Sequence, residues 1–172
     1  MTAHAHESAP SAWVERWSHH IRPGGAVLDL ACGPGRHARL LARMGFEVEA
    51  VDRDPSLFAE VPEGVVLRAA DLEAGPWPYG GRRFDGIVVT NYLHRPLLPR
   101  LVDALEPGGL LVYETFAEGN ERFGKPSNPD FLLRHGELLE AVRGRLRVLA
   151  YEDVVVGDPR PAAIQRIAAR LR

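Results

Sequence analysis

Five residues in the first half of the chain have the types and spacing of a binding site for a nucleoside-like ligand. They are Asp29, Gly33, Gly35, Asp52 and Asp71. Glycine accepts backbone angles that a side chain forbids, and it lets a ligand approach the main chain closely. A helix that follows such a turn points free N–H groups toward it. The apolar run before Gly33 and the helical pattern after Gly35 therefore predict a strand, a tight turn and a helix beside a ligand.

The three aspartates narrow the class of ligand, which the glycines leave open because their spacing also fits a dinucleotide fingerprint. Asp29 lies within the first apolar run, where a carboxylate is a poor neighbour for a pyrophosphate and a good one for an ammonium. Asp52 ends the second run and can accept hydrogen bonds from both ribose hydroxyls. Asp71 follows the third run and can accept from the exocyclic amine of adenine. Together they suit a nucleoside that carries an ammonium and no phosphate, as S-adenosylmethionine does.

Each aspartate also has a plainer interpretation. Asp29 can anchor the turn through backbone N–H groups, Asp52 can be a solvated strand end, and Asp71 can cap a helix or brace a turn.

Two other functions of the protein stay open at this point. One is an NAD(P)-dependent Rossmann oxidoreductase, which the glycines and Asp52 favour. The other is a non-catalytic partner subunit that binds S-adenosylmethionine.

Apolar runs and helical patterns alternate along the chain and predict the elements that position these residues. We expect strands at 26–30, 47–51, 65–69, 84–90 and 110–114, and helices at 11–21, 36–44, 55–60 and 97–105. Contiguous apolar strands separated by helices are typical of a parallel sheet covered on both faces. The sequence therefore predicts an α/β fold with a doubly wound, mostly parallel sheet. The first helix either packs on the sheet edge or forms a lid over the ligand.

The last third of the chain has a different pattern. Residues 115–129 are polar and rich in Gly, Asn and Pro, which predicts a loop, and residues 131–142 show a broken helical pattern. A long strand is expected at 146–156. Residues 162–171 fit helical spacing better than alternation. The short turn before them nevertheless favours a strand that completes a C-terminal antiparallel hairpin.

Composition limits the class of protein. With 172 residues, of which 45% are hydrophobic, we expect one domain at 11–172 after a disordered lead-in at 1–10. A formal net charge of −2 gives no electrostatic reason to expect nucleic acid. No apolar run approaches the ~20 residues that span a bilayer, and the lead-in lacks the apolar core of a signal peptide, so a cytoplasmic protein is expected. His4 and His6 have no further ligands near them in the sequence, so no metal is expected.

Taken together, these motifs resemble the class I S-adenosylmethionine-dependent methyltransferases. The matching runs are Val27-Leu28-Asp29-Leu30-Ala31-Cys32-Gly33-Pro34-Gly35 with Asp52, Ala70-Asp71-Leu72, Phe84-Asp85-Gly86-Ile87-Val88-Val89, and Glu106-Pro107-Gly108-Gly109-Leu110-Leu111-Val112. Within the class, the short chain is similar to the small tellurite-resistance-type (TehB-like) methyltransferases. The resemblance implies a Rossmann-like methyltransferase fold, S-adenosyl-L-methionine as cofactor, and a small-molecule methyl acceptor. It implies neither a membrane nor a nucleic-acid partner, and it leaves the oligomeric state open.

The resemblance also implies roles by position. The implied cofactor-binding residues are Asp29, Ala31, Gly33, Gly35, Asp52, Arg53, Asp71, Leu72 and Asn91. Asp29 and the glycine turn would flank the methionine part, and Asp52 would hold the ribose. Asp71 and the Leu72 backbone would hold adenine, with Asn91 near the sulfonium.

Methyl transfer requires proximity, orientation and exclusion of water, so no catalytic signature is obligatory. A general base would add ~10²–10⁴-fold if the acceptor carries a proton. His94 is the candidate base and Tyr92 a candidate for shaping the pocket, although residues 91–94 can equally begin a helix. The 115–129 loop can fold over the acceptor. Its mixture of Phe, Asn and the cations Arg122 and Lys125 favours a small polar or anionic acceptor, the alternative being a solvated surface loop.

Overall fold

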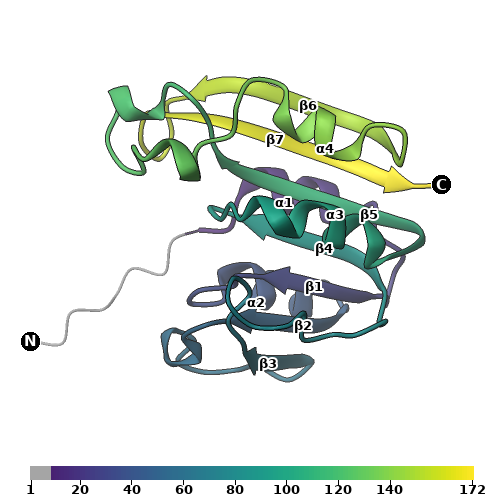
Figure 1. Cartoon of the computed structure of the whole chain (residues 1–172). Coiled ribbons are helices and arrows are strands. Elements are labelled where there is room, and N and C mark those ends of the chain that lie inside the picture. The colour runs from purple at the N-terminus through teal and green to yellow at the C-terminus, as the bar shows by residue number, and fades with distance from the viewer. Residues whose placement is uncertain (1–8) are drawn as a thin grey trace, which may run out of the picture.

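A computed structural model of the chain describes residues 9–172 and contains a seven-stranded sheet (Figure 1). The strands are β1 (Ala26–Leu30), β2 (Glu47–Asp52), β3 (Val65–Ala69), β4 (Phe84–Thr90), β5 (Leu105–Phe116), β6 (Leu146–Val156) and β7 (Ala162–Leu171). Their order is β3-β2-β1-β4-β5-β7-β6. Strands β1 to β5 are parallel, and β7 runs antiparallel to both β5 and β6. The prediction of a doubly wound, mostly parallel sheet with a C-terminal hairpin is confirmed.

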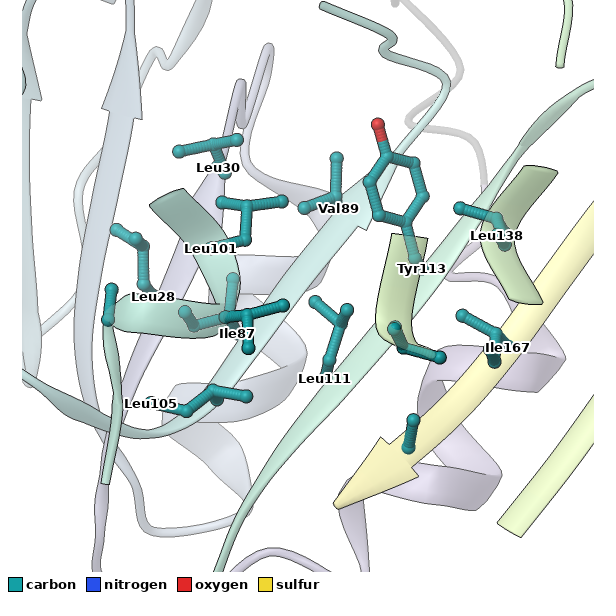
Figure 2. Packing of buried hydrophobic residues seen from close by; sticks show 14 of the residues in the cluster. Leu28, Leu30, Ile87, Val89, Leu101, Leu105, Leu111, Tyr113, Leu138 and Ile167 are labelled. Carbon is teal, nitrogen blue, oxygen red and sulfur yellow. The ribbon is translucent and has the colours of Figure 1, made fainter. Parts of the chain in front are cut away.

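The helices divide between the two faces of the sheet. They are α1 (Ala12–Ser18), α2 (Arg36–Arg43), α3 (Leu98–Asp103) and α4 (Glu137–Val142), with 3₁₀ turns η1 (Pro55–Leu57), η2 (Arg95–Leu97), η3 (Asn120–Arg122) and η4 (Pro129–Phe131). Apolar residues of α1 and α2 form one buried cluster with one face of the sheet. Those of α3 and α4 form a second cluster with the other face. Figure 2 shows part of the second cluster, with Leu28, Ile87 and Leu111 beneath Leu101.

The strand order places a topological switch point between β1 and β4. From β1 the chain runs outward through β2 and β3, and it then returns to the opposite side of β1 as β4. The pairing of Leu30 with Val89 sets the ends of these two strands side by side. In open α/β sheets, ligands bind outside the carboxyl ends of the strands at such a point.

Several predicted boundaries differ from those of the structure. The helix expected at 97–105 ends at Asp103, and β5 begins already at Leu105. The pairing then jumps to Leu110 opposite Gly86, so the Gly-rich run forms an irregular part of β5. The helix expected at 55–60 is a single 3₁₀ turn that begins at Pro55. The predicted 115–129 loop begins later, since β5 continues to Phe116.

Helix α1 packs on the sheet. Trp13 and Trp17 are 5% and 8% exposed, and the indole N–H of Trp13 donates to the carbonyl of Ile167 in β7 at 3.2 Å. The helix therefore covers interior strands of the sheet, and the expected position at the sheet edge was wrong. His4 and His6 lie outside the described residues. Among residues 9–172, no helix combines the length and the apolarity that crossing a membrane requires.

Candidate active site

A cavity of about 230 Å³ lies at the carboxyl ends of β1, β2 and β3. It is lined by Ala31, Asp52, Arg53, Ala70, Asp71, Leu72, Glu73 and Tyr92. Six of these residues were predicted from the sequence as site residues: Ala31, Asp52, Arg53, Asp71, Leu72 and Tyr92. The structure thus brings together residues that are up to 61 positions apart in the sequence, counted from Ala31 to Tyr92.

Two carboxylates of this cavity are held by the main chain and keep capacity to bind a ligand. Asp52 accepts the N–H of Gly33 at Oδ2 and that of Asp54 at Oδ1, both at 2.9 Å. Asp71 accepts two backbone N–H groups at Oδ1, from Glu73 at 2.9 Å and Ala74 at 3.0 Å, which hold its pKa below the usual value. A carboxylate offers about four lone-pair sites, so each side chain can still accept two hydrogen bonds. The proposed hydroxyls and amine of an adenosyl group match that capacity.

The two turn glycines are required for different reasons. Gly33 and Gly35 both have positive φ, of 52° and 86°, which favours glycine at each position. A Cβ on Gly33 would meet open space, whereas one on Gly35 would lie 2.1 Å from the Phe58 ring. Gly35 therefore makes room for Phe58, and Gly33 presents its N–H to Asp52. Neither glycine lines the cavity.

Asp29 lies beneath the turn and does not line the cavity. It is 1% exposed, and its carboxylate accepts a hydrogen bond from the backbone of Ala38. Burial raises its pKa to about 7, and its Oδ2 has no hydrogen-bond partner among the described residues. The contact with Ala38 joins β1 to the start of helix α2, directly after the glycine turn. Both predicted roles of Asp29, as an anchor for the turn and beside the methionine ammonium, stay predictions.

A second cavity, of about 360 Å³, adjoins the first. Its lining residues are Glu73, Asn91, Tyr92, Leu93, Thr115, Phe116, Pro126 and Phe131. Glu73 and Tyr92 line both cavities, and the Tyr92 hydroxyl donates to Glu73 Oε1 at 3.3 Å. The space between the ends of β4 and β5 therefore adjoins the cavity that Asp52 and Asp71 line.

Two residues that line these cavities have an unusual backbone conformation. Ala31 and Asn91 have φ of 55° and 51°, values that residues other than glycine seldom adopt. Each residue directly follows a central strand, β1 or β4. Such strained positions cluster at functional sites. Asn91 lines the second cavity, so its predicted place near the reacting centre fits the geometry, although its role stays a prediction.

His94, the candidate base, lines neither cavity. It is half-buried and lies at the start of η2, where its carbonyl accepts the N–H of Leu97 at 3.0 Å. Its role as a base stays a prediction. Glu73, by contrast, borders both cavities and was not singled out from the sequence. It belongs to the turn after Asp71, whose course depends on hydrogen bonds that the sequence pattern does not reveal.

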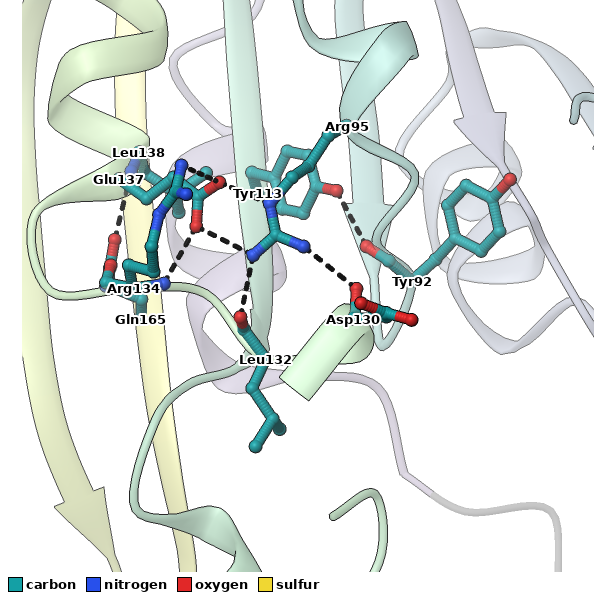
Figure 3. Close-up of polar contacts among 9 residues, drawn as sticks. All are labelled: Tyr92, Arg95, Tyr113, Asp130, Leu132, Arg134, Glu137, Leu138 and Gln165. Carbon is teal, nitrogen blue, oxygen red and sulfur yellow. Dashed lines mark hydrogen bonds and ion pairs between the residues drawn. The ribbon is translucent and has the colours of Figure 1, made fainter. Parts of the chain in front are cut away.

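Arg95 joins the segment after β4 to one wall of the second cavity (Figure 3). Its guanidinium donates to Glu137 Oε1 at 2.6 Å and to the carbonyls of Asp130 and Leu132 at 3.0 and 2.8 Å. These two carbonyls flank Phe131, which lines the cavity. Arg95 therefore fixes the position of that wall. Sequence reasoning missed it because its partners lie 35 to 42 positions away.

The start of the described chain is attached to the same edge of the sheet. The N–H of Ser11 donates to His37 Nε2 at 2.9 Å, and the Ser11 hydroxyl donates to Glu114 Oε1 at 2.8 Å. His37 is 2% exposed, and burial lowers its pKa to about 3, so the imidazole is neutral. Because Nε2 accepts, Nδ1 carries the hydrogen and donates to Thr90 Oγ1 at 3.2 Å.

The cationic side chains of the 115–129 segment do not reach the second cavity. Arg122 and Lys125 are exposed and are absent from its lining, whereas Thr115, Phe116 and Pro126 form part of it. Arg122 lies over the Phe123 ring and donates to the carbonyl of Gly119. The expectation was a small polar or anionic acceptor, and the part of it that depended on these two cations, a preference for anions, is not supported.

Comparison with known proteins identifies the family. The family described as Methyltransferase domain matches residues 2–152, and the chain belongs to that family. TehB from Haemophilus influenzae superposes with a TM-score of 0.78 at 20% identity, covering 96% of this chain and 63% of that one. A TehB-like SAM-dependent methyltransferase from Corynebacterium glutamicum gives 0.66 at 20% identity, covering 93% and 88%. The predicted membership of a methyltransferase family is confirmed, and with it S-adenosylmethionine as the cofactor. The similarity to the TehB structures, at 20% identity, is one of fold. The alternative function, an NAD(P)-dependent Rossmann oxidoreductase, is set aside.

Curated relatives match over part of their length. Trans-aconitate 2-methyltransferase of Delftia acidovorans is 26% identical over 157 residues, which are 81% of this chain and 58% of the relative. Protein-L-isoaspartate O-methyltransferase of Methylorubrum extorquens is 33% identical over 120 residues, which are 60% and 52%. The chain thus spans about half the length of these relatives.

Proposed function

We propose that the protein transfers the methyl group of S-adenosylmethionine to a small molecule bound in the second cavity. The observation that carries this proposal is the adjoining pair of cavities, which share Glu73 and Tyr92. One cavity presents the carboxylates that suit an adenosyl group. The other, of about 360 Å³, lies within the range of small-ligand sites.

The chain's own residues would hold and shield the reactants. Asp52 would bind the ribose hydroxyls, and Asp71 would accept from the adenine amine. The bound cofactor supplies a methyl group that is already activated by the sulfonium. The remaining requirement is to orient an acceptor and exclude water, for which Phe116 and Phe131 provide apolar walls.

The names of the curated relatives indicate acceptors of different kinds. They include trans-aconitate, a protein and a ribosomal RNA. The size of the second cavity favours the small-molecule class for this chain. The acidic balance of the chain, with a net charge of −2, supports the same choice over RNA.

Calorimetric titration of the full chain with S-adenosylmethionine and S-adenosylhomocysteine tests the cofactor site. We expect both to bind, and Asp52→Asn to weaken each at least about tenfold, because hydrogen bonds to a carboxylate contribute about 1.5–3 kcal/mol each. Asp54→Asn is the matched control, since Asp54 is exposed, follows Asp52 by two residues and lines neither cavity. Absence of binding to the unmodified chain would contradict the proposal.

A further inference from the structure

The lining of the second cavity is mostly apolar and carries little charge. Of the described residues that line it, Glu73 alone is charged. Four others are apolar, and three are polar and uncharged: Leu93, Phe116, Pro126 and Phe131, and Asn91, Tyr92 and Thr115. An occupant therefore meets apolar walls and a single carboxylate.

The surroundings reinforce this negative balance. The adjoining first cavity adds Asp52 and Asp71 against a single cation, Arg53. Arg95, behind the Phe131 wall, already pairs with Glu137 at 2.6 Å and with two carbonyls. An anion in the second cavity would thus face like charge, whose unfavourable energy grows as water is excluded.

The polar groups of the cavity can recognise a donor. Glu73 accepts one hydrogen bond from the Tyr92 hydroxyl at 3.3 Å and has capacity for more. Burial and the Glu73 charge both raise the pKa of Tyr92, so this hydroxyl stays a neutral phenol that donates to Glu73. The oxygens of Asn91 and Thr115 can accept from a hydroxyl or an amine.

We propose, on the basis of the function proposed above, that the acceptor is a neutral or cationic molecule with an apolar body and a hydroxyl or amine as the methylated group. Glu73 selects against anionic acceptors and pairs with the charged end of a cationic one. In the reaction, a lone pair of the acceptor oxygen or nitrogen forms the bond to the methyl carbon. The carbon–sulfur bond breaks with its electron pair going to sulfur, and the proton of the acceptor passes to water.

Three probes that differ only in terminal charge test this proposal. Tyramine, tyrosol and 4-hydroxyphenylacetate share a phenol ring and end in an ammonium, a hydroxyl and a carboxylate. Their affinities are measured by calorimetry on the full chain saturated with S-adenosylhomocysteine. We expect tyramine and tyrosol to bind at least about tenfold more tightly than 4-hydroxyphenylacetate, a difference typical of a like charge placed near an acceptor.

Substitution of the carboxylate separates its charge from the shape of the cavity. Glu73→Gln should weaken tyramine about three- to fivefold, strengthen 4-hydroxyphenylacetate, and leave tyrosol within about twofold, as expected for one partly exposed ion pair. Glu63→Gln is the matched control, because Glu63 is exposed and precedes β3, whereas Glu73 follows it at the opposite edge of the sheet. Phe131→Ala should weaken all three probes alike, since it removes a wall and no charge.

The possible failures are distinguishable. Equal or tighter binding of 4-hydroxyphenylacetate overturns the inference, and so does failure of all three probes to bind the saturated chain. An identical response of Glu73→Gln and Glu63→Gln also overturns it. Failure of S-adenosylhomocysteine itself to bind would instead contradict the proposed function. Thermal unfolding of each variant verifies that the fold is retained.

Discussion

At the scale of single residues, Gly33 and Gly35 show how one turn can depend on two different constraints. Both have a left-handed backbone, but only Gly35 faces a ring, that of Phe58. We expect Gly33→Ala to lower the free energy of unfolding by about 1 kcal/mol from backbone strain, and Gly35→Ala by about 3 kcal/mol from strain and overpacking. Urea denaturation measures both. Equal losses in the two variants would show that the Phe58 ring does not clash with a Cβ at position 35. The same conclusion would follow if the double variant Gly35→Ala/Phe58→Leu regained none of the lost free energy of unfolding.

Asp29 makes the stability of the fold depend on pH. Its pKa is about 7 in the fold, against 3.8 in an ordinary aspartate, because burial disfavours the charged form. Between these values the unfolded chain loses a proton that the folded chain keeps, so this contribution to stability falls as pH rises. Asp29→Asn should therefore raise the free energy of unfolding more at about pH 8 than at about pH 5. A gain that is the same at both pH values would contradict this assignment.

His37 makes the stability of the fold depend on pH in the opposite sense to Asp29. Its pKa is about 3 in the fold, against 6.5 for a free imidazole. As pH falls below about 6.5, the unfolded chain gains a proton that the folded chain excludes, and stability is lost. His37→Gln should flatten the decline between about pH 6.5 and pH 4. Comparison with His20→Gln, an exposed histidine, controls for the loss of an imidazole; similar curves for both variants would argue against a buried neutral His37.

The candidate site residues that the sequence predicted are those at or directly after the end of a strand. Asp52 and Asp71 could be found from the sequence because each terminates or follows an apolar run in a parallel sheet. Glu73 and Phe131 could not, since they reach the site through a turn and a 3₁₀ turn whose shapes depend on distant contacts. Asp29 shows a different limit: its position in β1 was predicted, but the sequence could not show whether it faces the cavity or the underside of the turn.

At the scale of elements, Arg95 joins η2 to the segment between η4 and α4. Removing its guanidinium would leave the carbonyls of Asp130 and Leu132 without this donor, and Glu137 with hydrogen bonds from Arg134 only. We expect Arg95→Gln to speed amide hydrogen exchange in residues 130–137 at least about tenfold, because lost hydrogen bonds to charged groups cost about 1.5–3 kcal/mol. Affinity for S-adenosylhomocysteine should be unchanged.

Arg100→Gln is the control for that experiment, because Arg100 is exposed on the neighbouring helix α3. Unaltered exchange in residues 130–137 of Arg95→Gln would mean that the wall is held by its other contacts. A loss of cofactor affinity alone would place the effect of Arg95 in the first cavity instead.

The elements themselves were largely predictable, and the exceptions have a common cause. Strand β7 lies between two neighbours and is buried along most of its length, so it lacks the alternation that marks a half-exposed strand. Its spacing of Ile164, Ile167 and Ala168 consequently resembled a helix. The short turn before β7 predicted a strand correctly, because such a turn joins two antiparallel strands in a hairpin.

At the scale of the whole molecule, the reversal of strand order at β1 and β4 creates the site. It brings the ends of β1, β2 and β3 into one cavity and the ends of β4 and β5 into the adjoining one. The sequence predicted this sheet and most of the residues that line the first cavity. The charge of the second cavity could not be predicted, because Arg122 and Lys125 are exposed and do not line the cavity that their segment helps to form.

The most direct test of the account is to follow the methyl group itself. The full chain is incubated with S-adenosylmethionine labelled on its methyl group and a cell extract separated into small molecules, proteins and RNA. We predict label in the small-molecule fraction, lost with Asp52→Asn and retained with Asp54→Asn. Label confined to protein or RNA, or no transfer to any fraction by a chain that binds the cofactor, would contradict the assignment of a small-molecule methyltransferase.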